Sequence, residues 1–167
     1  MPISPELARV YASAPTDVYY VETLSLEHPA FADGIIYITN QPGGWTATIE
    51  TLEVVEFLPV PFATVPPRSA DEAALTLQVG IDNASAVLME NLELISQSPT
   101  DPILVKYRIY LSNDTATVQN DPPLKLDVIN VTATMDTVSF AAGITNLRKL
   151  PFPAQLYDTV SFPGLQR

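Results

Sequence analysis

Hydrophobic and polar residues alternate along several parts of the chain, as expected for β-strands that bury one face. The clearest part begins at Leu75, from which apolar side chains at every second position as far as Ile81 point the same way. Asp82 and Asn83 then interrupt the alternation, and both are favourable N-cap residues. Apolar residues at helical spacing follow. The pattern therefore predicts a strand and then an amphipathic helix over residues 83–97 that packs against a sheet.

Runs of β-branched and aromatic residues between turn-forming residues predict further strands on both sides of this unit. Before it they cover residues 18–26, 35–39 and, as one strand or a strand pair, 45–57. After it they cover residues 103–112, 124–136 and 138–144, the last two forming a hairpin. The fold class is therefore predicted to be mainly β, a β-sandwich or strongly curved sheet with one flanking α-helix.

The chain of 167 residues is long enough to form one domain with a sizeable core. Residues 1–17 are expected to form an N-terminal arm with a helical turn around Glu6–Tyr11, residues 18–150 the sandwich, and residues 151–167 an extended tail. Sixteen prolines against six glycines favour extended connectors. Two such connectors are predicted, one over residues 59–67 and one, a polar projecting loop, over residues 113–123.

Composition and charge exclude several classes of function. The chain has no cysteine, which excludes disulfides and thiol chemistry, and no leader-like apolar start, which favours assembly in a cytoplasm. The net charge is −11, and residues 1–100 carry all of it, with thirteen acids and two bases. Such a protein does not grip nucleic acid. The acids either solvate the surface or line a passage along which DNA slides without binding.

The sequence predicts no catalytic, cofactor or metal site, and no enzyme activity. His28, the single histidine, precedes a proline at a strand end and is interpreted as a turn residue without catalytic partners. Glu50, Glu53 and Glu56 alternate between the faces of a strand and would not converge on a metal. The oxygen-rich stretch over residues 113–121 lacks the spacing of a calcium-binding EF-hand loop.

Four motifs give the chain a resemblance to a known family. They are ETLSLEHPAF near the N-terminus, LTLQVGIDNASAVLMENL in the middle, PILVKYRIYLSND after it, and the closing LPFPAQLYDTVSFPGL. This pattern resembles a family of phage and prophage tail-module proteins of unknown function, with an IDN strand-to-helix junction and a PFP…Y…FPGL ending. The resemblance covers roughly residues 18–165. The chain departs from it at Gln166-Arg167, where an aromatic residue is expected.

The resemblance implies a structural virion protein at the tip of a long non-contractile phage tail, similar to distal tail proteins. These share a tail-tube-like sandwich and assemble as hexameric rings, so the implied partners are further copies of the chain and the tail-tube, tape-measure and hub proteins. DNA would pass through without specific binding, and no membrane is implied.

Two sets of residues would serve this role. Acids expected to line the lumen are Glu50, Glu53, Glu56, Asp71 and Glu72. Extended segments expected to reach neighbouring subunits carry Pro59, Pro61, Pro66, Pro67, Asn113, Asp114, Phe152, Tyr157 and Phe162. Proline suits such arms because it lowers the entropy lost on docking.

Other functions stay open. Within the tail, the alternatives are a tail-tube or terminator subunit and a trimeric hub component. A module that binds a host receptor or glycan would instead expose aromatic side chains around Trp45. A small hydrolase would need a pair of carboxylates that converge in space.

Overall fold

The computed structural model describes residues 3–65, 76–82, 90–91, 94–95, 101–134 and 137–143. Helix α1 spans Pro5–Ser13. The strands are β1 (Tyr20–Glu27), β2 (Ile35–Thr39), β3 (Trp45–Thr48), β4 (Val54–Pro59), β5 (Phe62–Val65), β6 (Thr76–Asp82), β7 (Leu104–Leu111), β8 (Leu124–Ala133) and β9 (Thr137–Gly143). The predicted mainly β fold class is confirmed.

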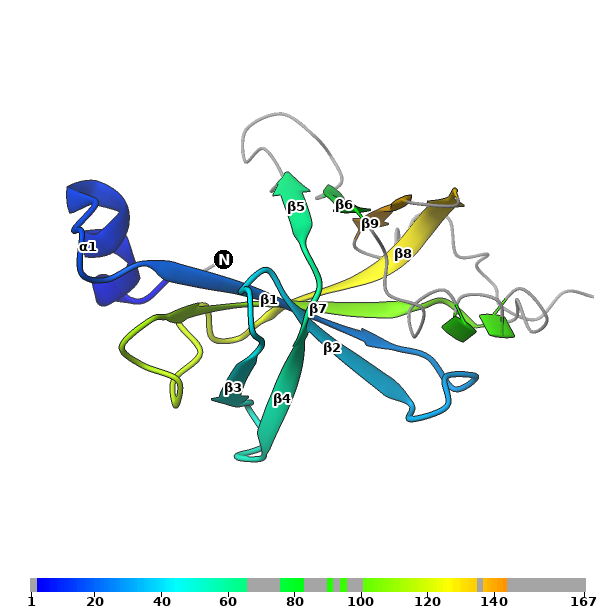
Figure 1. Ribbon diagram of the computed structural model, residues 1–167, viewed down its shortest axis with the longest axis horizontal. Coiled ribbons are helices and arrows are strands. Elements are labelled where there is room, and N and C mark those ends of the chain that lie inside the picture. The colour runs from blue at the N-terminus through cyan, green and yellow to red at the C-terminus, as the bar shows by residue number, and fades with distance from the viewer. Residues whose placement is uncertain are drawn as a thin grey trace, which may run out of the picture.

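The nine strands form one sheet in the order β3-β4-β2-β1-β7-β8-β9-β6-β5. Neighbouring strands are antiparallel, except that β2 and β4 are parallel. The two layers expected of a sandwich are therefore parts of one strongly curved sheet. In Figure 1 the β3–β4 hairpin extends to one side of the crossing point of β1 and β7, and β5, β6 and β9 lie on the other.

The sheet curls because β4 and β5 are almost continuous in the chain but belong to different parts of the sheet. Strand β4 pairs with β2, and the Val60 amide extends this contact by donating to the Thr39 carbonyl at 3.0 Å. After Pro61, strand β5 pairs with β6 instead. A strand that changes partners at a bend is a usual way to turn a corner between packed sheet layers.

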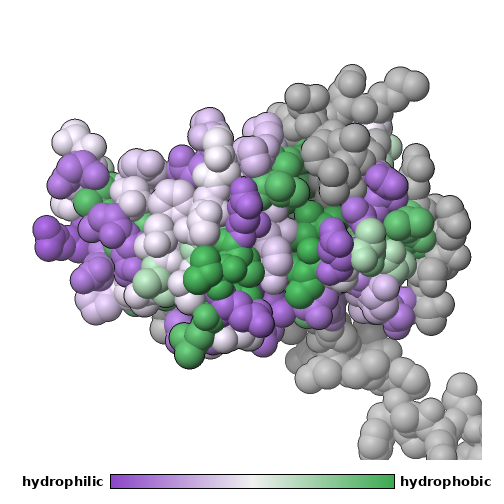
Figure 2. All heavy atoms as spheres, turned by 60° about the horizontal axis from the view of Figure 1, so that its bottom comes forward, coloured by the Kyte–Doolittle hydropathy of each residue, from purple (hydrophilic) through white to green (hydrophobic). Residues whose placement is uncertain are grey.

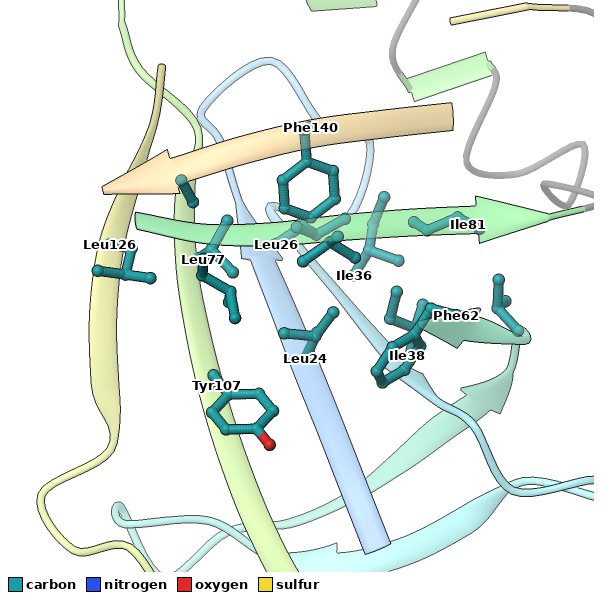
Figure 3. Close-up of a cluster of buried hydrophobic side chains, with 14 of the residues drawn as sticks. Leu24, Leu26, Ile36, Ile38, Phe62, Leu77, Ile81, Tyr107, Leu126 and Phe140 are labelled. Carbon is teal, nitrogen blue, oxygen red and sulfur yellow. The ribbon is translucent and has the colours of Figure 1, made fainter. Parts of the chain in front are cut away.

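The main core fills the space enclosed by this curvature. Strands β6 and β9 cross over β1 and β2, and side chains from both pairs point toward one another (Figure 3). The core includes fully buried residues from five strands, among them Leu24, Ile38, Leu77, Ile81, Val105 and Ala142. Replacing one of these larger side chains by alanine removes buried apolar surface and leaves a cavity.

A second, smaller core lies on the opposite face of β1 and β7, where the β3–β4 hairpin folds over the sheet. It contains the buried residues Val21, Ala47, Ile49, Phe57 and Tyr110. The Phe57 ring lies between two tyrosine rings, with centroids 5.4 Å from Tyr37 and 6.2 Å from Tyr110. Strand β7 therefore buries both of its faces.

Helix α1 is fixed to the sheet at its first turn. The Ser4 hydroxyl accepts a hydrogen bond from the Leu7 amide at 3.0 Å, which makes Ser4 the N-cap. The Ser4 amide donates to the Gln119 carbonyl at 2.9 Å, and Leu7 is fully buried in the main core. The helical turn predicted around Glu6–Tyr11 is thus confirmed, and these residues of the expected N-terminal arm pack against the domain.

The loop after β7 is folded back on the sheet along its second half, which differs from the projecting loop predicted over residues 113–123. Asn120 is fully buried. Its Oδ1 accepts from the Ile109 amide at 2.8 Å, and its Nδ2 donates to the Tyr107 carbonyl at 3.0 Å. A buried amide that satisfies two backbone groups holds the loop against β7. The sequence pattern missed this because polar side chains are common both in loops that project and in loops that pack on a sheet.

The structure also bears on the connector predicted over residues 59–67 and on the helix predicted over residues 83–97. The prediction of a connector over residues 59–67 is wrong in part, because Phe62–Val65 forms β5. The predicted helix over residues 83–97 lies largely outside the described residues, but residues 90, 91, 94 and 95 are helical. Among them Ile95 packs against the main core, and the Asn91 side chain accepts from the Ala32 amide at 3.1 Å. The tail over residues 151–167 lies outside the described residues.

We expect Asn120→Ala to lower the free energy of unfolding by about 2–4 kcal/mol, because it leaves two buried backbone groups without partners. Asn113→Ala is the matched control, since Asn113 is exposed in the same loop, and it is expected to change the stability by less than about 0.5 kcal/mol. Urea-induced unfolding of both variants checks this. Equal losses would show that the loop is not fixed through Asn120.

Candidate functional site

A polar site under the β3–β4 hairpin is centred on Arg108, the most deeply buried of the lysine, arginine and acidic side chains that the structure describes. Alternation along β7 places Arg108 and Tyr110 on the same face, toward the second core. The side chain of Arg108 is only 2% exposed. A guanidinium group is always charged, so burial at this level requires a compensating partner.

Glu50, in the turn between β3 and β4, is that partner. The Arg108 Nε donates to its Oε1 at 2.6 Å and Nη2 donates to its Oε2 at 3.0 Å, which is the bidentate geometry of a strong pair. The remaining Arg108 nitrogen, Nη1, donates to the Ser25 hydroxyl on β1 at 2.8 Å. We call this arrangement of Arg108, Glu50 and Ser25 the arginine clamp.

Burial and the charge of Arg108 both shift the pKa values of the groups around the clamp. Burial alone would raise the pKa of Glu50, but the hydrogen bonds and charge of Arg108 outweigh burial and the pKa lies below its ordinary value. Burial raises the pKa of Tyr110 and of Tyr37, in both cases against the charge of Arg108. At neutral pH the site therefore holds one ion pair and two protonated phenols.

The clamp fixes the hairpin to the sheet from one side, and Tyr110 does so from another. The Tyr110 hydroxyl donates to the Thr48 carbonyl at 2.9 Å, and the Thr48 amide donates to the Thr115 carbonyl at 2.9 Å. Strand β3 is thus bound both to β7 and to the loop that follows β7. The arrangement suits a structural role in which the turn between β3 and β4 is held in one position.

A second polar group closes the main core between β1, β5 and β7. Glu22 Oε1 accepts from the Tyr107 hydroxyl at 2.6 Å and from the Thr64 hydroxyl at 3.0 Å. Burial, followed by the hydrogen bond to Glu22, raises the pKa of Tyr107. These bonds connect β5 to strands that are distant from it in the sheet order, so they help to hold the curled sheet closed.

The acids predicted to line the lumen that the structure describes all lie on the β3–β4 hairpin, in different surroundings. Glu50 is bound in the clamp, whereas Glu53 is exposed and accepts a hydrogen bond from the Thr51 hydroxyl. Glu56 is exposed on β4, and Asp71 and Glu72 lie outside the described residues. Within the described residues, no group of three or more histidine and acidic side chains is arranged to hold a metal ion.

The described residues among those predicted to form intersubunit arms lie at the β4–β5 bend and in the loop after β7. Pro59 ends β4, and Pro61 is exposed before β5. Asn113 is exposed, while Asp114 accepts from two backbone amides of its own loop, those of Ala116 and Thr117. Pro66, Pro67, Phe152, Tyr157 and Phe162 lie outside the described residues.

His28 and Trp45 are both held inside the fold. The Ala30 amide donates to His28 Nδ1 at 3.1 Å, so Nε2 carries the proton that is donated to the Asp101 carbonyl at 3.0 Å. This agrees with the prediction that His28 is a turn residue. Trp45 packs against the second core. Its Nε1 is buried, with no hydrogen-bond partner among the described residues, so its ring is not a fully exposed platform for a glycan.

Two surface features were not predicted from the sequence. Leu52, at the tip of the β3–β4 hairpin, is 85% exposed and has φ of 64°. A shallow groove of about 390 Å³ crosses the outer face of β5, β6, β8 and β9. Its walls include Ala63, Val65, Gln78, Asn130, Thr132 and Ser139.

In the described part of the chain, no helix is long and apolar enough to span a membrane.

We expect Glu50→Ala to lower the free energy of unfolding by about 3 kcal/mol, because it leaves the buried charge of Arg108 without its partner. Glu53→Ala, in the same turn but exposed, is the control and is expected to change the stability by less than about 0.5 kcal/mol. Denaturant unfolding at neutral pH measures both. A loss no larger in Glu50→Ala than in the control would contradict the clamp.

The contribution of the clamp depends on pH. Because the pKa of Glu50 is lower in the folded chain, its contribution is complete above the ordinary glutamate pKa of about 4.3 and is lost as the pH falls through the folded-state pKa. The difference in unfolding free energy between the wild type and Glu50→Gln should therefore shrink between about pH 6 and pH 3. A difference that stays constant over this range would show that Glu50 does not titrate in the clamp.

Comparison with known proteins places the chain in a family by sequence. A search of curated protein sequences gives no match. Residues 6–157, which include the nine strands and all of α1 except its first residue, match the family described as a domain of unknown function, DUF1833. The match covers most of the chain, and the protein therefore belongs to the DUF1833 family.

Proposed function

We propose that the protein is a structural subunit of a long, non-contractile phage tail, located at the tail tip, where it joins the tail tube to the hub as a ring. The observation that carries this proposal is the sequence resemblance, above all the IDN junction and the closing PFP…Y…FPGL motif. In this role the chain performs no reaction. It binds further copies of itself and the tail-tube, tape-measure and hub proteins.

The surface of the described residues supports a passage that does not retain DNA. Exposed acids outnumber exposed bases by nine to two in this part of the chain, with Arg9 and Lys125 as the bases. Phosphate binding depends on clusters of lysine and arginine, and a surface of this kind repels DNA. The exposed acids are Glu6, Asp17, Asp33, Glu50, Glu53, Glu56, Glu90, Asp101 and Asp121.

The clamp narrows the proposed set of lumen-lining acids. Glu50 neutralises Arg108 and contributes little net charge to a passage, so Glu53 and Glu56 remain as the proposed lining residues that the structure describes. The clamp also supports a structural role, since it fixes a hairpin without leaving a free acid, base or nucleophile. Intersubunit arms stay part of the proposal, with Pro59, Pro61 and Asn113 as the exposed described residues.

A module that binds a glycan or host receptor is the second candidate, and one observation favours it. Tyr11 of α1 and Tyr20 of β1 are about half exposed, with ring centroids 5.3 Å apart. Paired exposed aromatic rings can stack on apolar faces of a ligand. Loss of envelope binding on Tyr11→Ala, in a protein that stays monomeric, would favour this function over the tail ring.

Self-assembly is the first prediction of the tail proposal. We expect the purified protein to form a closed oligomer, with a hexamer as the specific expectation, because distal tail proteins of this kind form rings. Native mass spectrometry and images of the particles measure mass and symmetry. A three-fold particle would instead support the hub, and a protein that is monomeric at all concentrations would contradict the proposal.

The second prediction concerns the passage. We expect Glu56→Lys to leave tails assembled and to slow genome ejection severalfold, because a lysine on the wall attracts passing phosphates. The control is Glu6→Lys, a change of the same charge on the exposed side of α1. The rate of DNA release from phage carrying either variant measures ejection. Equal rates would remove Glu56 from the passage.

A further inference from the structure

At the tip of the β3–β4 hairpin, one apolar residue has both an unfavourable backbone conformation and a side chain exposed to water. Leu52 adopts a left-handed conformation that favours glycine or asparagine, and its side chain is 85% exposed. Val54, two residues later, is 69% exposed. Neither feature stabilises the isolated subunit, so the leucine is better explained by a contact that the subunit makes outside itself.

The tip is also held in place before any partner arrives. The Leu52 amide donates to the Ile49 carbonyl at 2.9 Å, and the Ile49 amide donates to the Glu53 carbonyl at 2.9 Å. The arginine clamp fixes the same turn through Glu50. A preorganised apolar tip loses little conformational entropy on binding. Figure 2, which turns the hairpin side of the molecule forward, shows hydrophobic surface bordered by hydrophilic surface.

The groove across β5, β6, β8 and β9 is a concave surface, whereas the hairpin tip projects. None of the residues that line it carries a charge. It offers apolar contact at Ala63, Val65 and Ala141. Around these stand neutral hydrogen-bond donors, the amides of Gln78 and Asn130 and the hydroxyls of Thr132 and Ser139.

Electrostatics favour this groove as the place where a second copy binds. Two copies of a chain with net charge −11 repel one another over most of their surfaces. The groove adds no negative charge, and its neutral donors can bind the carboxylate of Glu53 beside the apolar tip. The absence of charge in the groove and its apolar contacts therefore favour the tip of another copy over a second groove, which would bring no apolar projection.

We propose that Leu52 and Val54 of one copy insert into the β5-β6-β8-β9 groove of the next. The strands β3 and β4, which carry the tip, lie on the other side of the crossing of β1 and β7 from β5, β6 and β9, which contribute to the groove (Figure 1). A contact between two different surfaces is heterologous and generates a ring when its rotation closes. The inference rests on the proposed self-assembly and adds the interface. It moves Glu53 from the wall of the passage to this interface and leaves Glu56 at the rim of the interface, facing the passage.

Leu52→Asn separates a binding role from a folding role. Asparagine tolerates the left-handed conformation, so the midpoint of denaturant unfolding of the monomer should stay the same or rise slightly. Loss of the buried leucine should raise the dissociation constant of each contact at least about tenfold. Analytical ultracentrifugation measures the assembly. The control Leu58→Asn changes an exposed leucine on β4 that is not at the tip. Equal weakening by both variants would overturn the assignment of the tip.

Cysteine cross-linking tests the contact directly, because the chain has no cysteine of its own. Leu52→Cys protein mixed with Ser139→Cys protein should form disulfide-linked dimers under mild oxidation, and Leu52→Cys mixed with Ala12→Cys, on α1, should not. A chain carrying both Leu52→Cys and Ser139→Cys should give a ladder that ends at the ring size. Rings without the tip-to-groove disulfide would overturn this interface and leave the ring proposal standing. A strictly monomeric wild type would overturn both.

Discussion

The bend between β4 and β5 is the constraint on which the rest of the fold depends. A strand that pairs with β2 before Pro61 and with β6 after it forces the two ends of the sheet to face each other. The enclosed space then becomes the main core, and apolar residues of β1 and β2 meet those of β6 and β9. The hydrogen bonds from Thr64 and Tyr107 to Glu22 strengthen the closure from inside. Packing and polar contacts therefore act on the same joint.

The arginine clamp illustrates how a buried charge gives position rather than much net stability. Removing two charges from water is unfavourable, and the attraction between them offsets that cost only when the geometry is good. Here the geometry is bidentate, and the clamp joins a hairpin turn to the middle of the sheet. An apolar pair could fill the same volume, but it would not specify where the turn sits. The position of the tip is what the proposed interface requires.

The sequence predicted the strands well and the site poorly, and the reason is physical. Runs of β-branched and aromatic residues between turns located β1, β2, β7, β8 and β9 within a few residues, because such a run is a local signal that does not depend on which strands lie beside it. Strand β5 was missed because prolines on both sides resemble a connector, and the bend that makes it a strand is a tertiary feature. Arg108 stands among apolar residues in β7, which is a signal of burial. Its partner is 58 residues away in the chain, and no local pattern could identify Glu50.

The pairing of β1 with β7 has a consequence for how the protein is made. Strand β1 emerges from the ribosome before its register partner on one side, β7, which follows about eighty residues later. Until then the nascent chain exposes a strand edge able to pair with other chains. A topology with so many distant contacts folds slowly. The edge of β1 is therefore covered only once β7 has been synthesised, so completion of the sheet depends on the second half of the chain.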